Sequence, residues 1–440
     1  MKRHGMTRKL VFLGLLVLLC SWLYVEFNQV DARATNGERV HNIDTRLNYT
    51  KIQEAIDAVE TLDGHTIFVE EGTYYEHVVV NKSLSLIGMS RDTTIIDGNG
   101  TGIVIFVTAS SVTIKEFTVK NGDTGIYLDR SNNSLIMKNN VSYHIDAIFV
   151  RYSCNCTIHQ NIAGNNTNRG VLVTNSWNFT LSNNNVYGNG WYGINANASV
   201  NGLIKQNNAY KNDLDGIGLL DSNNCTIAEN TVENNKFCGI LIETSSESFI
   251  YHNNIIDNGI QAESFQTNQW DNGLEGNYWS NYTGVDSNRD GIGDTSHVIN
   301  ENNTDPYPLM GIFHSFNTSL SYYVNVISNS AVEDFEYFES NNTIKMHVTN
   351  VTANQTFGFC RIRIPHPLMS EPYNVTVDGV EPYYVNYTLY DDGESRWIYF
   401  SYEHSTLEVV IIPEFSHGLI IPLTMVATLL AFIAHKRKPS

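Results

Sequence analysis

Basic residues are scarce in this 440-residue sequence, which has 27 Lys and Arg against 46 Asp and Glu and a formal net charge of −19. A protein that binds nucleic acid through its phosphates needs a basic surface, so this charge balance excludes nucleic acid as a partner. Charged residues of both signs together make up only 17% of the chain. Because 42% of the residues are hydrophobic, the composition also excludes a disordered chain.

The sequence is rich in the turn-forming residues Asn and Gly, with 53 and 31 residues, and also contains 24 Tyr. Asn is a poor helix former, and both Asn and Gly tolerate the left-handed backbone of tight turns. The composition therefore predicts a turn-dense, all-β chain. A chain of 440 residues is too long for one compact core, so we expect two or three domains or an elongated repeat.

Cysteine is also rare, with six residues, of which Cys20 lies in a segment that we expect to be removed. Cys156 and Cys225 lie 69 residues apart. The repeat described below places these two cysteines three coils apart, about 14 Å at the ~4.8 Å spacing of strands. A disulfide does not span that distance, so we expect the remaining cysteines to be small buried side chains.

Long apolar runs occur only at the two ends of the sequence. Residues 1–34 contain basic residues, an uncharged run from Leu10 to Val25 and the small-residue pattern Ala32-Arg33-Ala34, which predicts a secretory signal peptide, with an uncleaved anchor as the alternative. Residues 418–434 are uncharged and precede a basic tail at 435–440, which predicts one transmembrane helix with a cytoplasmic tail. We therefore expect an extracellular body, anchored in the plasma membrane by its C-terminus.

About 18 Asn-x-Ser/Thr sequons occur along the chain, among them Asn48, Asn81, Asn140, Asn178, Asn224, Asn281, Asn350 and Asn386. A chain rich in Asn, Ser and Thr generates several sequons by chance. They therefore permit N-glycosylation of an exported protein without showing that it takes place.

The middle of the sequence repeats every 22 or 23 residues. A small residue followed by an apolar residue marks the units, at Gly125, Ala147, Gly170, Gly193, Gly216 and Gly239. Fourteen residues further on, each unit has an asparagine, namely Asn139, Asn161, Asn184, Asn207, Asn230 and Asn253. A unit of this length cannot bury an apolar face alone, so the units must stack. We predict an all-β, right-handed parallel β-helix in which the Asn columns hydrogen-bond along the stack. Leucine-rich repeats, the main alternative, need more leucines than most of these units contain.

The start of the solenoid needs a cap. Residues 49–60 are amphipathic, with Ile52, Ala55, Ile56 and Val59 on one face, which predicts a capping helix. From Thr66 onward, alternating apolar residues predict the first coils, and about nine or ten coils reach residue 262.

Several motifs carry a resemblance to a known family. Ile52-Gln53-Glu54-Ala55-Ile56, Val69-Glu70-Glu71-Gly72-Thr73-Tyr74 and Leu84-Ser85-Leu86-Ile87-Gly88 resemble the entry into pectin-lyase-type β-helices. The repeats resemble the NosD-like family of exported β-helix proteins, which includes archaeal surface proteins, and the similarity covers residues 45–310. Gly276-Asn277-Tyr278-Trp279-Ser280 is similar to the exit from the helix in that family. The resemblance implies the fold and export, but no catalytic residue, because repeats rather than a catalytic motif define the family. We do not carry over its association with copper.

Residues 315–412 lack the repeat but contain strand-like runs, at 343–348, 357–364, 373–377, 397–402 and 407–412, and a hairpin signal at Val377-Asp378-Gly379-Val380. They predict a small immunoglobulin-like β-sandwich that spaces or presents the solenoid. Beyond it, Pro413-Glu414-Phe415 ahead of the apolar segment resembles archaeal sorting signals.

One loop has the spacing of a calcium site. Oxygen ligands at positions 1, 3, 5, 7 and 9 would come from Asp286, Asn288, Asp290, the backbone of Ile292, and Asp294, with Gly291 at position 6. Position 12 is His297 instead of Glu, so Asp305 or Glu301 would have to complete the shell. We expect a structural Ca²⁺ here, with a metal-free Asp/Gly turn as the alternative.

Stacking the repeats also produces one column of titratable residues: Asp146, Arg169, Tyr192, Asp215 and Cys238. Asp146, Arg169 and Asp215 are the candidate catalytic residues of a polysaccharide lyase, epimerase or hydrolase. The two aspartates are three coils apart, about 14 Å, which exceeds the ~9.5 Å limit for two carboxylates acting on one glycosidic bond. We therefore favour a structural role for this column. Cys154, Cys156 and His159 form a second, weaker candidate as a soft metal site.

Aromatic side chains at Trp191, Tyr192, Tyr187 and Tyr210 provide ring faces that could stack on sugars, with ordinary packing between coils as the alternative. We expect a membrane-anchored, non-catalytic surface protein that binds or displays against glycans or surface-layer proteins. The alternative is an extracellular polysaccharide lyase, epimerase or glycoside hydrolase.

Overall fold

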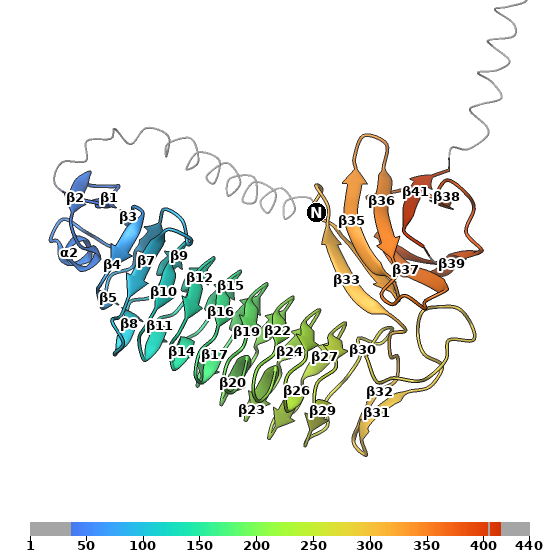
Figure 1. Ribbon diagram of the computed structural model, residues 1–440, viewed down its shortest axis with the longest axis horizontal. Coiled ribbons are helices and arrows are strands. Elements are labelled where there is room, and N and C mark those ends of the chain that lie inside the picture. The colour runs from blue at the N-terminus through green and yellow to red at the C-terminus, as the bar shows by residue number, and fades with distance from the viewer. Residues whose placement is uncertain (1–36, 404, 415–440) are drawn as a thin grey trace, which may run out of the picture.

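The computed structural model describes residues 37–403 and 405–414, which form a β-solenoid followed by a two-sheet β-sandwich (Figure 1). The predicted signal peptide (1–34), membrane segment (418–434) and basic tail (435–440) lie outside these residues. Within them, no helix is long and apolar enough to cross a membrane.

Three sheets form the walls of the solenoid. From β3 (Thr66–Val69) to β29 (Ile260–Ser264), consecutive strands belong to different sheets, so the chain winds from one wall to the next. Sheet A contains β1 (Val40–Asn42), β2 (Leu47–Tyr49), β3 (Thr66–Val69), β6 (Ser85–Gly88), β9 (Thr113–Lys115), β12 (Leu135–Met137), β15 (Thr157–His159), β18 (Thr180–Ser182), β21 (Leu203–Lys205), β24 (Thr226–Ala228) and β27 (Phe249–Tyr251). Sheet B contains β4 (Gly72–Tyr74), β7 (Thr94–Asp97), β10 (Thr118–Lys120), β13 (Asn140–Ser142), β16 (Ile162–Gly164), β19 (Asn185–Tyr187), β22 (Asn208–Tyr210), β25 (Thr231–Glu233), β28 (Asn254–Ile256) and β30 (Tyr278–Trp279). Sheet C contains β5 (Val78–Val80), β8 (Ile103–Val107), β11 (Thr124–Asp129), β14 (Asp146–Arg151), β17 (Arg169–Thr174), β20 (Ile194–Asn197), β23 (Ile217–Leu220), β26 (Cys238–Glu243) and β29 (Ile260–Ser264).

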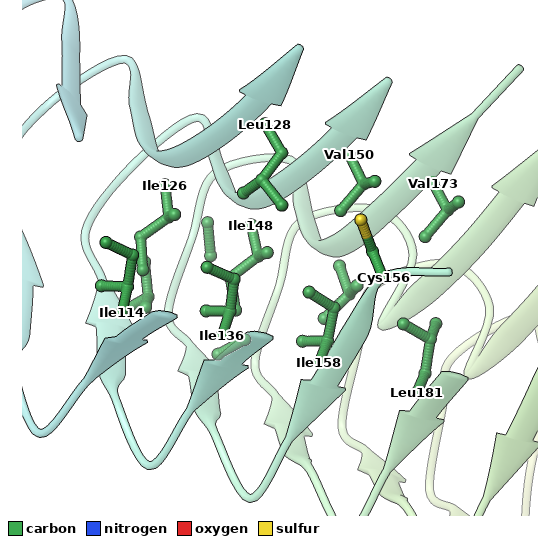
Figure 2. Close-up of a cluster of buried hydrophobic side chains, with 14 of the residues drawn as sticks. Ile114, Ile126, Leu128, Ile136, Ile148, Val150, Cys156, Ile158, Val173 and Leu181 are labelled. Atoms are coloured by element: carbon green, nitrogen blue, oxygen red, sulfur yellow. The ribbon is translucent and has the colours of Figure 1, made fainter. Parts of the chain in front are cut away.

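The core of the solenoid consists of stacked, like side chains. In sheet A, Ile114, Ile136, Ile158 and Leu181 are partners in successive parallel strands and are buried, and Figure 2 shows them in one row. A row from sheet C, which includes Ile126 and Ile148, faces them across the interior. Each coil thus buries its apolar side chains against the coils on either side, as the repeat predicts.

A buried asparagine ladder lines the corner between sheets A and B. Asn161 shows the pattern, because its Oδ1 accepts hydrogen bonds from the backbone N–H and side-chain amide of Asn139 at 2.9 and 3.1 Å, and its Nδ2 donates to Ile136 O at 2.8 Å. The pattern continues to Asn253 and Asn277. A second ladder from Asn166 to Asn258 follows the corner between sheets B and C. Both ladders supply hydrogen bonds to buried backbone groups at the tight corners, where the backbone does not provide them.

The capping helix is α2 (Ile52–Asp57), with Ile52, Ala55 and Ile56 buried. The prediction for Val59 is wrong, because the helix ends before this residue and leaves it 84% exposed.

The sandwich follows a short hairpin of β31 (His297–Asn300) and β32 (Asn303–Asp305). One sheet contains β33 (Ile312–Asn317), β34 (Tyr323–Ser328), β37 (Phe357–Pro365), β40 (Ser395–Glu403) and β39 (Tyr384–Asp391). The other contains β35 (Ala331–Phe338), β36 (Thr343–Thr349), β41 (Leu407–Pro413) and β38 (Tyr373–Val377). Buried side chains from both sheets form one core. The turn at Val377–Val380 forms as predicted, but it does not join a hairpin, because β39 pairs in the opposite sheet.

Two contacts fix the sandwich against the last coils. The side-chain amide of Asn254 in β28 donates to Phe313 O and its Oδ1 accepts from Phe313 N, at 2.9 and 2.8 Å. The buried carboxylate of Glu275 accepts from Arg361 Nε at 2.7 Å and from Trp397 Nε1 at 2.9 Å, and pairs with His252 at 2.9 Å. The solenoid and the sandwich are therefore held at a fixed angle.

Candidate functional site

The column of titratable residues forms on the outer face of sheet C, as the repeat predicts. Asp146 and Arg169 are partners in adjacent strands, and Arg169 Nη1 lies 3.4 Å from Asp146 Oδ1. The same Asp146 oxygen accepts hydrogen bonds from Arg169 N and Asn168 Nδ2. The Arg169 guanidinium also lies over the ring of Trp191, 5.4 Å from its centroid. Both charges are thus neutralised and held within the protein.

Asp215 lies further along this column and is fully buried. The ring of Tyr192 lies over the neighbouring Gly218, where an added Cβ would be 2.9 Å from Tyr192 Cε1. Asp215 Oδ1 accepts from Cys238 N at 3.0 Å, whereas Oδ2 has no hydrogen-bond partner. Burial raises the pKa of Asp215 to about 6, although the Cys238 N–H opposes this increase. A carboxyl of this kind can hold a proton near neutral pH, but the full burial of Asp215 keeps it out of reach of a substrate in this conformation.

The candidate catalytic residues therefore do not form a catalytic pair. Asp215 lies three coils along the column from Asp146, and each carboxylate has its own partners on separate strands. A pair of carboxylates acting on a glycosidic bond must flank one substrate atom and be accessible to it.

The candidate binding aromatics lie on two separate surfaces. Tyr187 and Tyr210 are register partners on the outer face of sheet B and stack, with ring centroids 5.1 Å apart and planes at 20°. Trp191, which is 50% exposed, meets Tyr192 edge-on at 6.5 Å, near sheet C. The tyrosine pair and Trp191 thus offer two independent ring surfaces. The ring of Tyr192 mainly covers Gly218.

The predicted calcium loop turns its carboxylates onto its own backbone. Asp286 accepts from the N–H groups of Asp290 and Gly291, Asp290 accepts from Ile292 N, and Asp294 accepts from Ser287 N. Asn288 Nδ2 donates to Asp290 at 3.0 Å. Within residues 37–403 and 405–414, no three His, Cys, Asp or Glu side chains gather in a group that could hold a metal ion.

The proposed completion of that loop by Asp305 does not agree with the geometry. Asp305 is buried elsewhere and accepts from Trp279 Nε1, Asn277 N and Tyr307 N. His297, at position 12, stacks on Trp279 at 4.3 Å. A carboxylate oxygen that accepts one N–H still has a lone pair for a cation, so these contacts do not test Ca²⁺, which stays a prediction.

The other metal candidate is also dispersed. Cys156 points into the core of the solenoid, whereas His159 faces outward and pairs with Ser182 Oγ at 2.9 Å. The five cysteines of the described residues are all free thiols, and burial raises the pKa of Cys156 and Cys225 to about 11.

Two features escaped the sequence reasoning. Phe106, Tyr127 and Phe149 stack along the outer face of sheet C at 5.3 and 4.7 Å. Their spacing of 21 and 22 residues follows the repeat, so aligning the units one position further would have found this stack. The second feature is the Glu275 cluster, whose members share no period.

The comparisons with known proteins agree with this geometry. Residues 79–284 match the family model described as periplasmic copper-binding protein (NosD). A cell surface glycoprotein of Methanothermus fervidus is 38% identical over 103 residues, which are 23% of this chain and 17% of that protein. The match thus spans about a sixth of the relative's length.

Solved structures resemble the chain at low identity. The A-module of the mannuronan C-5 epimerase AlgE6 from Azotobacter vinelandii is 20% identical, with a TM-score of 0.39, over 53% of this chain and 76% of that one. The PL6 family alginate lyase AlyGC is 12% identical, with a TM-score of 0.37, over 51% of this chain and 36% of that one. Neither likeness carries an inference about the activity of this chain.

Among the residues that the structure describes, the copper named in the family description has no matching donor set, because Cys154, Cys156 and His159 do not converge and no other candidate cluster is present. The match with the family model covers coils of the solenoid and their repeat. The chain therefore contains a parallel β-helix that resembles the NosD family over residues 79–284.

Proposed function

We propose that this chain is a non-catalytic surface protein whose β-helix binds carbohydrate of the cell envelope or its surroundings. The observation that carries the proposal is the stacked pair Tyr187 and Tyr210 on the outer face of sheet B. Because Tyr187 lies between Gly164 and Tyr210, the pair offers a sugar the outer ring face of Tyr210 together with ring edges and hydroxyl groups. Trp191 offers a second ring surface on the other side of the coil. The name of the Methanothermus relative, cell surface glycoprotein, supports the envelope as the setting.

Membrane anchoring by residues 418–434 belongs to this proposal, as does the division into a solenoid at 45–310 and a presenting sandwich at 315–412. The sandwich would act as a spacer between the anchor and the solenoid.

Binding assays on the full chain, with neutral and uronic-acid polysaccharides in the presence and absence of Ca²⁺, test the proposal. We expect binding without chain cleavage, and weaker binding after Tyr210→Ala or Trp191→Ala. Tyr75→Ala is the matched control, because Tyr75 is 71% exposed near the N-terminal end of the solenoid. Absence of binding to every polysaccharide would contradict the proposal.

An extracellular lyase, epimerase or hydrolase is the second candidate. The observation that favours it is Asp215, a carboxyl whose pKa burial raises to about 6 and whose Oδ2 lacks a partner. Cleavage or epimerisation that disappears in Asp146→Asn or Asp215→Asn would establish this alternative instead.

A further inference from the structure

A cleft opens at the elbow of the molecule, where β33 of the sandwich lies against the outer face of sheet B. It has a volume of about 380 Å³. From the solenoid it is lined by Asn208, Glu229, Thr231 and Glu233, and from β33 by residues 313–316. We refer to it as the elbow cleft. Neither module forms the cleft alone, because each contributes one wall.

The walls of the elbow cleft are held rigidly. Asn254 grips the backbone of Phe313 through two hydrogen bonds, and the rings of His252 and Phe313 stack at 4.1 Å. Phe316 stacks on Phe335 at 4.3 Å, so the outer end of β33 is also supported. A cleft held in this way is preorganised, and a ligand binds without the cost of ordering it.

Polar groups with no protein partner line the cleft. Asn208 Oδ1 and His314 Nε2 are both shielded from solvent and have no hydrogen-bond partner. Glu233 forms no ion pair or side-chain hydrogen bond among the described residues, whereas Glu229 is engaged by Lys205 and Gln206. Leaving such atoms unpaired is unfavourable, so a hydroxyl-bearing ligand that reaches them gains hydrogen bonds there.

The charge of the residues that line the elbow cleft favours an uncharged ligand. Two carboxylates and no Lys or Arg side chain line the cleft, and burial lowers the pKa of His314 to about 4, so His314 is neutral at physiological pH. Uronates, sulfates and phosphates would meet repulsion from Glu233, which has no cationic partner, whereas Lys205 compensates the charge of Glu229. A neutral, polyhydroxylated molecule meets only acceptors and amides.

The cleft also continues into the tyrosine pair. Tyr187, Tyr210 and Glu233 occupy one column on adjacent strands of sheet B. A ring face beside a free carboxylate, with the amide of Asn208 on the same strand as Tyr210, combines stacking with acceptors for neighbouring hydroxyls. The lining asparagines belong to no sequon, so an N-glycan of this chain would not be attached within the cleft.

We propose that the elbow cleft binds one or two rings of a neutral saccharide, held by Glu233 and Asn208 and continued over Tyr210. This inference rests on the proposed carbohydrate binding and deepens it, because it names the site and the charge class of the ligand.

The test compares the full chain with Glu233→Ala and Asn208→Ala, using neutral hexose and N-acetylhexosamine oligosaccharides and uronic-acid oligosaccharides of equal length as probes. We expect the wild type to bind the neutral probes and each variant to bind them at least about tenfold more weakly. Asn201→Gly is the control, because Asn201 is an exposed residue at another corner and its φ of 57° suits glycine. Unchanged thermal unfolding shows that the variants fold, and either variant suffices if the other does not.

The outcomes separate the two proposals. Neutral binding that both elbow variants retain would overturn the elbow cleft and leave carbohydrate binding standing elsewhere on the solenoid. Preference for the uronic-acid probes would overturn the assigned charge class. No binding of any probe by the wild type would overturn both proposals together.

Discussion

Two buried carboxyl groups, at Asp215 and Glu275, respond to their surroundings in opposite directions. Asp215 has one backbone donor and no charged partner, so burial raises its pKa to about 6. Burial would raise the pKa of Glu275 as well, but the hydrogen bond with His252 and the charge of Arg361 outweigh it and lower this pKa to about 2. The number of donors around each carboxyl group decides whether its pKa is raised or lowered.

Asp215→Asn should stabilise the protein at alkaline pH. The folded pKa lies above the value of about 3.9 in an unfolded chain, so the stability that Asp215 contributes is complete below about pH 4 and is lost as the pH rises through about 6. Asn stays neutral and can still accept from Cys238 N. We expect the variant to melt at a higher temperature than the wild type at pH 8, and at a similar temperature at pH 4. A variant that is less stable than the wild type at pH 8 would contradict this assignment.

At the scale of elements, the coils of the solenoid are joined by side-chain ladders as well as by their strands. Asn207 accepts from the backbone N–H and the amide of Asn184 at 3.0 and 2.9 Å, and it donates to Leu181 O at 2.8 Å. Its Nδ2 also donates to Asn230 Oδ1 at 3.0 Å, so one side chain bonds to the coils on both sides.

Asn207→Ala should lower the free energy of unfolding by about 2–4 kcal/mol, because it leaves a buried N–H and a buried carbonyl without partners. Asn201→Gly, at the exposed corner between sheets C and A of the same coil, should change the free energy of unfolding by less than about 0.5 kcal/mol. Denaturant unfolding of both variants measures the difference. Equal effects would show that burial of the ladder contributes nothing.

The sequence predicts the ladders, the register and the neighbours of the candidate residues, because a fixed period of 22 or 23 residues places equal positions side by side. Asp146 next to Arg169 and Tyr187 next to Tyr210 follow from that period alone. The burial of Asp215 does not, because it depends on how the surrounding side chains pack. The period does not predict the elbow cleft either. The angle between the solenoid and the sandwich is fixed by Arg361 and Trp397, which lie 86 and 122 positions after their partner Glu275.

At the scale of the whole molecule, Glu275 joins the solenoid to the sandwich. Its lowered folded pKa means that the stability it contributes is present above about pH 4.3, the value in an unfolded chain, and is lost as the pH falls toward about 2. Glu275→Gln should therefore lower the free energy of unfolding at pH 7 by on the order of 3 kcal/mol, with a smaller difference at pH 3. Denaturant unfolding at both pH values measures this, with the exposed Glu247→Gln as the control. A pH-independent difference would contradict the role of the charge.

The sequons are also distributed unevenly over the molecule. Sixteen asparagines have buried side chains, and none of them begins a sequon. In the ladder between sheets A and B, the residue two places after the buried Asn points into the core, as Val186 does after Asn184, so a Ser or Thr there is excluded. By contrast, Asn155, Asn178 and Asn224 are exposed in one column at the corner between sheets C and A, each followed two places later by a Thr.

We expect N-glycans on Asn155, Asn178 and Asn224 when the full chain is exported from a host that glycosylates such proteins, and peptide mass spectrometry measures the occupancy. Asn201 occupies the same column with a similar backbone but is followed by Leu203 in place of Thr, so it should be unmodified. Leu203→Thr should add a glycan there, because the variant completes the sequon in an accessible turn. If Asn201 stays unmodified in that variant while its neighbours carry glycans, accessibility of the column is not the deciding property. Glycans at this corner would cover the side of the solenoid away from sheet B, and would leave the tyrosine pair and the elbow cleft open to a partner.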